Sequence, residues 1–139
     1  MEAFQKLKKK PAILIIDGHG ISHPRGLGIA SHLGILLDIP TIGVAKSILF
    51  GRPAGPLGSK VGAQVALVEG NRILGMLLRT KARSHPVIIS AGHKISLPTS
   101  IEVVKSCLRG YRLPEATRHA HLAANATRKS ALINCFGSC

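Results

Sequence analysis

The sequence predicts an α/β domain built on a mixed sheet. Two short apolar runs, residues 12–16 and 41–45, flank a helical pattern, which is typical of a βαβ unit with two parallel strands. Two further apolar runs are joined by Glu69-Gly-Asn-Arg72, which indicates an antiparallel hairpin. The 139 residues suit a single domain, and because aromatic residues are only 3% of the chain, its core must be aliphatic.

The first half of the chain supplies the βαβ unit. Residues 12–16 are aliphatic and largely β-branched, as in a buried strand. Residues 26–37 place apolar side chains on one helical face, and this helix must end before Pro40, because a residue preceding proline avoids the helical conformation. Residues 41–45 form the second strand. The Gly- and Pro-rich residues 51–58 are a predicted loop.

The second half adds antiparallel strands and two helices. Strands are predicted at 61–68, 73–79 and 87–91. A helix is predicted from residue 97 to about 109, with Thr99 and Glu102 forming a capping box, and a last helix from about 114 to 129. Residues 1–10 form a basic N-terminal segment and residues 130–139 a tail, with no linker that divides the chain.

The charge of the chain predicts a polyanionic partner. Nineteen basic residues against six acidic ones give a formal charge of +13, which favours nucleic acid first and a membrane surface second. The scarcity of aromatic residues argues against binding of single strands by base stacking. No segment is long enough to span a bilayer. Three cysteines without paired spacing, Cys107, Cys135 and Cys139, fit a reducing compartment, so we expect a cytoplasmic protein. The Cys135–Cys139 pair in the tail has no predicted role.

The segment that begins at Asp17 carries the first candidate site. Asp17 ends a predicted strand and is followed by Gly18 and Gly20, at the position where α/β folds bind their ligands. A carboxylate there is either a ligand for Mg²⁺ or a cap for the next element, and the residues leave both interpretations open. His23 and Arg25 add donors suited to a phosphate.

Three further residues are candidates by position. Lys46 ends the strand parallel to that of Asp17, so it either holds a phosphate near Asp17 or is a surface lysine. His93 follows a strand and either donates to a phosphate, orients a water or is structural. His119 and His121 are two residues apart and therefore lie on different helical faces, which indicates surface positions.

Several motifs together resemble the endonuclease V family. They occupy residues 17–34, 40–46 and 92–97, and the last helix, residues 113–121, is similar to the end of that family. The resemblance implies a ribonuclease-H-like mixed sheet with flanking helices. It also implies a DNA repair endonuclease, dependent on Mg²⁺ or Mn²⁺, that recognises deaminated adenine (hypoxanthine, from deoxyinosine). Such an enzyme hydrolyses the second phosphodiester bond 3′ to the lesion, and some members act on inosine in RNA.

The resemblance also implies roles for individual residues. Asp17 resembles a metal-binding aspartate, Lys46 the lysine beside the scissile phosphate, and His121 an active-site position that also faces the metal. Residues matching positions around the base pocket or the nucleic acid are Gly18, Gly20, His23, Arg25 and Leu49, with His93 in a supporting role.

This chain departs from the family at its N-terminus. In the family a segment bearing a first metal-binding aspartate, a glutamate and a tyrosine-containing wedge precedes the strand of Asp17, whereas ten residues precede Pro11 here. We therefore expect residues 1–139 to form a partial domain that lacks the first N-terminal strands and has weak or no activity. A second chain could complete the sheet. The alternatives are a non-catalytic nucleic-acid-binding fragment and a small nucleotide-binding protein.

Overall fold

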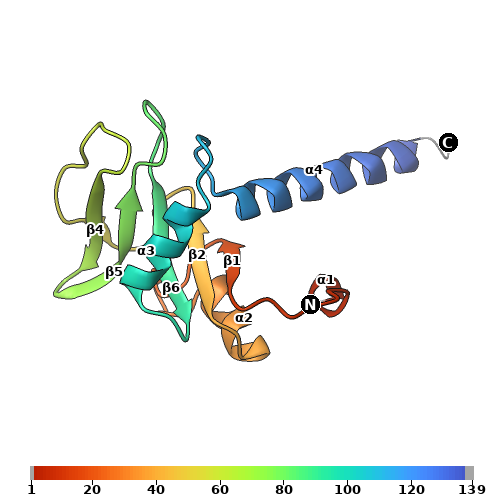
Figure 1. The fold of residues 1–139 in the computed structure, drawn as a ribbon, viewed down its shortest axis with the longest axis horizontal. Coiled ribbons are helices and arrows are strands. Elements are labelled where there is room, and N and C mark those ends of the chain that lie inside the picture. Colours follow the sequence, from red (N-terminus) through yellow and green to blue (C-terminus); the bar gives the residue numbers. More distant parts are fainter. Residues whose placement is uncertain (1, 137–139) are drawn as a thin grey trace.

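A computed structural model describes the backbone of residues 2–136 and the side chains of residue 2 and residues 4–125. In this part of the chain six strands form one mixed sheet, in the order β1-β2-β6-β5-β4-β3 (Figure 1). The strands are β1 (Leu14–Asp17), β2 (Thr41–Ala45), β3 (Arg52–Pro53), β4 (Gln64–Glu69), β5 (Arg72–Leu78) and β6 (Val87–His93). The helices are α1 (Glu2–Gln5), α2 (Ile29–Leu37), α3 (Leu97–Ser106) and α4 (Glu115–Phe136). The predicted α/β class with a mixed sheet is confirmed.

The parallel pair at one side of the sheet positions the candidate site. β1 and β2 run parallel, with Asp17 opposite Val44, as the βαβ pattern predicts. β6 pairs antiparallel with β2, and β5 and β4 follow as the predicted antiparallel hairpin. The carboxyl ends of β1 and β2 therefore lie side by side at one end of the strands, next to the start of β6.

Side chains alternate along the strands and divide the core into two layers. On one face Ile42 and Val44 of β2 are buried in a cluster with Ile101 and Val104 of α3. On the other face the Thr41 hydroxyl donates to the Ala30 carbonyl of α2 at 2.6 Å, so α2 covers the opposite side. A second cluster on that opposite face is covered by the segment after β2 and contains Ala45, Leu67, Leu74, Leu77 and Ile88.

The start of α2 and the cap of α3 differ from the predictions for local reasons, whereas the predicted start of α3 at Leu97 is confirmed. α2 begins at Ile29 rather than residue 26, because Gly26 has a φ of 66° and Gly28 is an extended N-cap. α3 begins at Leu97 with Ser96 as its cap, whose Oγ accepts from the Thr99 backbone N–H at 3.3 Å. The predicted Thr99–Glu102 capping box is thus wrong. Pro98 occupies the first turn, where a missing N–H costs nothing, so the cap must precede it.

The ends of the chain also differ from their predictions. α4 continues to Phe136 rather than stopping at 129, so most of the predicted tail is helical, and this helix projects from the sheet (Figure 1). α1 forms within the predicted basic segment. The predicted loop 51–58 includes the two-residue strand β3, whose proline is tolerated at the end of the sheet. Cys139 and the side chain of Cys135 lie outside the described residues.

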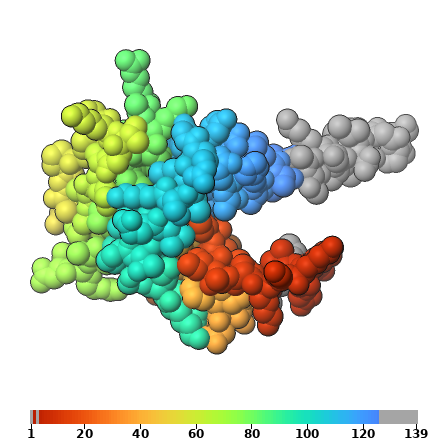
Figure 2. All heavy atoms as spheres, viewed as in Figure 1, coloured from red at the N-terminus to blue at the C-terminus, as the bar shows by residue number. Residues whose placement is uncertain are grey.

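The outer edge of β1 has no partner strand among residues 2–136. Beside this edge lies an apolar cavity of about 400 Å³, lined by Phe4, Leu7, Leu14, Ile16, Leu33, Leu37 and Ala120. The N-terminal segment and the first turns of α4 lie on this same side of the molecule (Figure 2). None of the described helices has the length and apolarity needed to cross a membrane.

Candidate functional site

The ends of β1 and β2 bring a carboxylate and an ammonium group together. Asp17 is the last residue of β1, and Lys46 follows β2 directly. The Lys46 Nζ lies 3.3 Å from the Asp17 Oδ2, and the two side chains are 35% and 41% exposed. The pair is open enough to be reached by a large ligand, and the predicted proximity of these two residues is confirmed.

His121 of α4 joins this pair from the other half of the sequence. Its Nδ1 lies 3.9 Å from the Asp17 Oδ2, which is too far for a direct hydrogen bond. The Asn125 Nδ2 lies 3.1 Å from the His121 Nε2, on the side of the ring away from Asp17. His119 instead lies 2.7 Å from Glu115, so the two histidines point to different sides, as their spacing predicts.

The donor set of this cluster does not complete a Mg²⁺ site. Mg²⁺ prefers several oxygen ligands in octahedral geometry. Here Asp17 is the single carboxylate, His121 adds one nitrogen, and Lys46 already neutralises the carboxylate. Among the described side chains no group of three metal-ligating residues comes together. Asp17 and His121 could therefore contribute to a metal site, but further ligands are needed.

The loop after Asp17 is held to the sheet by a network of hydroxyl groups. The buried Ser90 Oγ accepts from the Gly20 backbone N–H at 2.8 Å and from the Ser22 Oγ at 3.0 Å. The Ser22 Oγ also lies 2.9 Å from the His19 Nδ1. A side chain at Gly20 would place its Cβ 2.1 Å from the Ala91 carbonyl oxygen, so close packing on β6 demands glycine there.

The pKa of His19, beside this network, lies below its ordinary value of 6.5. The main cause is burial of the imidazole, and the nearby charge of His23 adds to it, against an opposing hydrogen bond that the ring donates to the backbone of Ser47. Sequence reasoning did not select His19, Ser22 or Ser90. A serine in the middle of the otherwise apolar β6 is the one signal that could have found Ser90, because a buried hydroxyl needs a partner.

The other predicted side chains lie either in the segments after β1 and β2 or at the opposite end of the strands. His23 is partly buried and accepts from the Arg25 backbone N–H at 3.2 Å, while the side chains of Arg25 and Leu49 are exposed, that of Leu49 by 55%. His93 is not brought to the cluster. It lies opposite Thr41, at the far end of β2, and its Nε2 is 3.4 Å from Asp38 at the end of α2.

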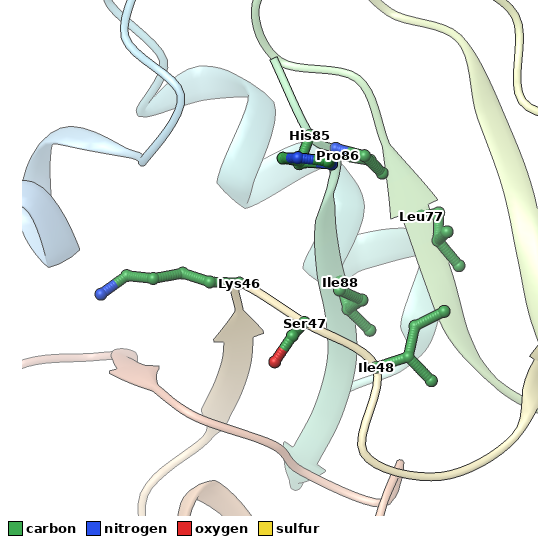
Figure 3. Close-up of a pocket in the computed structure, with 7 residues that line it drawn as sticks. All are labelled: Lys46, Ser47, Ile48, Leu77, His85, Pro86 and Ile88. Atoms are coloured by element: carbon green, nitrogen blue, oxygen red, sulfur yellow. The ribbon is translucent and has the colours of Figure 1, made fainter.

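A cavity of about 410 Å³ adjoins Lys46 on the opposite face of the sheet. It is lined by Lys46, Ser47, Ile48, Leu77, His85, Pro86 and Ile88 (Figure 3). The Lys46 side chain points away from this cavity in Figure 3, toward the Asp17 side of the sheet. The cavity and the Asp17 cluster therefore share the backbone of Lys46 rather than its ammonium group.

A carboxylate, a lysine and a histidine thus converge at two parallel strand ends of a basic α/β domain, the place where such folds bind their ligands. Comparison with known families gives the class of protein, since residues 1–122 match the family model for endonuclease V. The chain therefore belongs to the endonuclease V family, and the predicted resemblance is confirmed.

Individual relatives support this assignment. The chain is 59% identical over 129 residues to endonuclease V of Protochlamydia amoebophila, covering 93% of this chain and 55% of the relative. It is 49% identical over 130 residues to that of Gloeobacter violaceus, covering 94% and 53%. The chain thus spans about half the length of the curated relatives that it matches.

Solved structures show the same fold. Endonuclease V from Bacillus subtilis aligns with a TM-score of 0.91 at 31% identity, covering 96% of this chain and 57% of that one. The catalytic domain of human endonuclease V aligns with a TM-score of 0.85 at 35% identity, covering 94% and 59%. The Ciona intestinalis protein, solved with a 23mer DNA containing an inosine followed by a ribo-adenosine, gives a TM-score of 0.78 at 29% identity, covering 94% and 61%.

Proposed function

We propose that this chain forms part of a DNA repair endonuclease that recognises deaminated adenine and hydrolyses the second phosphodiester bond 3′ to the lesion. The observation that carries the proposal is the convergence of Asp17, Lys46 and His121 at the ends of β1 and β2. Family membership and the inosine-containing DNA bound to the Ciona intestinalis protein support the substrate class.

Each residue of the cluster has a chemical role in this proposal. Lys46 binds a non-bridging oxygen of the scissile phosphate as a point charge and stabilises the charge that develops during hydrolysis. His121 exchanges a proton with water or with the leaving oxygen. Asp17 supplies one oxygen ligand to Mg²⁺, or to Mn²⁺ in its place. Gly18, Gly20, His23, Arg25 and Leu49 line the path of the nucleic acid beside this cluster.

The incomplete donor set leads to a second part of the proposal. The remaining carboxylates come from a second polypeptide that adds strands to the open edge of β1 and covers the apolar cavity there. The unpaired edge and the cavity of about 400 Å³ are the surfaces that such an addition would bury. The chain by itself is therefore expected to cleave weakly or not at all. We place it in the cytoplasm, because its cysteine usage suits a reducing compartment.

Complementation in trans tests both parts. An inosine-containing duplex and an inosine-containing RNA are incubated with Mg²⁺ and the chain. The assay is repeated after addition of the part of the Protochlamydia amoebophila protein that precedes the matched region. We expect little nicking by the chain alone and nicking 3′ to inosine by the mixture, lost in Asp17→Ala. Co-elution of the two polypeptides without nicking would refute the catalytic assignment, and nicking of RNA alone would change the substrate.

The non-catalytic alternative is favoured by one observation, the absence of a complete group of ligands among the described side chains. In that case the basic surface binds nucleic acid and Asp17 has no catalytic role. Asp17→Ala would then leave binding unchanged or tighter, because it removes a negative charge near the phosphates. The mixture with the upstream part of the Protochlamydia amoebophila protein would then show no cleavage, whether it contains the parent chain or Asp17→Ala.

A further inference from the structure

Arg112, in the segment before α4, bonds to the backbone at the ends of two strands. Its Nη2 donates to the Lys46 carbonyl at 2.7 Å and to the Pro86 carbonyl at 3.1 Å, and its Nε donates to the His85 carbonyl at 2.8 Å. The Thr80 hydroxyl in turn donates to the Arg112 carbonyl at 2.5 Å. Three hydrogen bonds thus join this partly buried guanidinium to backbone carbonyls of the two strand ends.

These carbonyls lie just beyond the last hydrogen-bonded pair of residues between β2 and β6. Pairing between the two strands ends at Ala45 and Ile88, so Lys46 lies one residue beyond the last pair. Figure 3 shows Lys46 on one side of this gap, with His85 and Pro86 on the other. The guanidinium reaches both sides at once, because its Nη2 donates to Lys46 and Pro86 while its Nε donates to His85. Arg112 thus replaces the missing sheet pairing and fixes the backbone from which the Lys46 side chain extends.

The same segment sets the position of α4. Arg112 lies three residues before Glu115, the first residue of α4. The Glu115 backbone N–H donates to the Cys107 carbonyl at 2.9 Å. Within the first turns, the Arg118 guanidinium lies 3.7 Å from the centre of the Tyr111 ring. Because His121 extends from this helix, anchoring the segment at Arg112 also anchors the approach of His121 to Asp17.

We propose that Arg112 is a positioning residue that holds Lys46 and the start of α4 in register, so that Lys46 and His121 meet at Asp17. Arg112 acts through these groups and does not contact the nucleic acid itself. The consequence for DNA binding rests on the proposed function, whereas the consequence for the geometry of Lys46 does not.

Lysine acylation followed by mass spectrometry tests the geometry without any need for activity. In Arg112→Gln we expect faster acylation of Lys46, because the lysine is no longer held against Asp17, with the exposed Lys60 unchanged. Arg112→Lys should give an intermediate rate. The matched control is Arg109→Gln, because Arg109 also donates to carbonyls, but to those of Ser106 and Leu108 in its own segment rather than to the strand ends.

Thermal melting of each variant identifies those that fold, and Arg112→Lys carries the test if Arg112→Gln does not. An unchanged Lys46 acylation rate in a folded Arg112 variant would overturn the proposal. Equal acceleration in Arg109→Gln would do the same, because the effect would then follow from loss of any arginine.

Salt-dependent binding of an inosine-containing duplex tests whether Arg112 acts through Lys46. Loss of a phosphate-contacting lysine in Lys46→Ala should lower the slope of log affinity against log salt by about 1. If Arg112 acts through Lys46, Arg112→Gln/Lys46→Ala has the slope of Lys46→Ala alone. A slope lowered by a total of about 2 would show that Arg112 contacts a phosphate directly, against the proposal. If no variant changes binding while acylation of Lys46 still rises, the proposed function fails and the positioning role stands.

Discussion

Replacing Ser90 by alanine should loosen the loop that follows Asp17. The Ser90 side chain is fully buried, and its Oγ accepts from the Gly20 N–H and the Ser22 hydroxyl. In Ser90→Ala the Ser22 hydroxyl keeps His19 as a partner, whereas the buried Gly20 N–H loses its acceptor. An orphaned buried donor costs about 1–3 kcal/mol and a lost hydrogen bond about 1 kcal/mol, so we expect a loss of about 2–4 kcal/mol in the free energy of unfolding.

Ser100→Ala is the matched control for this change. Ser100 is equally buried, but its Oγ donates to the Ser96 carbonyl, which also accepts from the Ser100 backbone N–H. Its replacement therefore leaves no group without a partner and should cost less than about 1 kcal/mol. Urea unfolding of the two variants measures the difference, and melting temperatures should differ by roughly 3 °C per kcal/mol. Equal stability of Ser90→Ala and Ser100→Ala would refute the assignment of Ser90 as the anchor of the loop.

Two further predictions concern the same loop. Because burial and the charge of His23 lower the pKa of His19 below 6.5, the unfolded chain takes up this proton first as the pH falls. His19 therefore contributes stability above pH 6.5 that is lost as the pH falls through its folded pKa. Urea unfolding at about pH 7.5 and about pH 5.5 should show a smaller loss in His19→Asn than in the parent, and an identical loss would contradict the burial of His19. Gly20→Ala should destabilise the protein by roughly 1–3 kcal/mol or more, because its Cβ would meet the Ala91 carbonyl oxygen at 2.1 Å. Gly55→Ala, with no atom within 4 Å of the added Cβ, should be neutral or stabilise by about 0.4–1 kcal/mol, and equal melting temperatures of the two variants would count against the close packing of Gly20.

The two faces of the sheet define how a nucleic acid would meet the proposed site. Alternation along β1 and β2 places the side chains of Asp17 and Lys46 on the face of α3, with His121 reaching them from α4. The loop after Asp17 crosses to the other face, where a Cβ at Gly43 of β2 would lie 2.5 Å from the Gly20 backbone nitrogen. The proposed base contacts and the proposed phosphate contacts thus lie on opposite faces of the sheet, at the carboxyl ends of β1 and β2. A bound nucleic-acid strand would have to pass around these strand ends.

His93 illustrates the limit of reasoning from position along a strand. It follows an apolar run, as Asp17 does, so both appear as polar residues at strand ends. β6 runs antiparallel to β2. Its carboxyl end therefore lies beside the amino end of β2, at the opposite end of the strands from Asp17. There His93 contacts Asp38, whose pKa is lowered mainly by a hydrogen bond from Lys94 and secondly by one from His93 itself. The direction of β6, which no local pattern specifies, separated His93 from the cluster.

The sequence by itself determined the pairing of Asp17 with Lys46, because a short βαβ connection allows only parallel neighbours and parallel strands end at the same edge. It also determined the family, through motifs that are contiguous in the chain. The family resemblance had already assigned His121 to the active site, but only the tertiary structure showed how it reaches Asp17, since His121 arrives on a helix whose path depends on contacts far away in sequence. The anchoring roles of Ser90 and Arg112 were likewise decided there. Their partners lie across the sheet or beyond its last paired residues, and a hydrogen bond between distant segments leaves no periodic pattern in the chain.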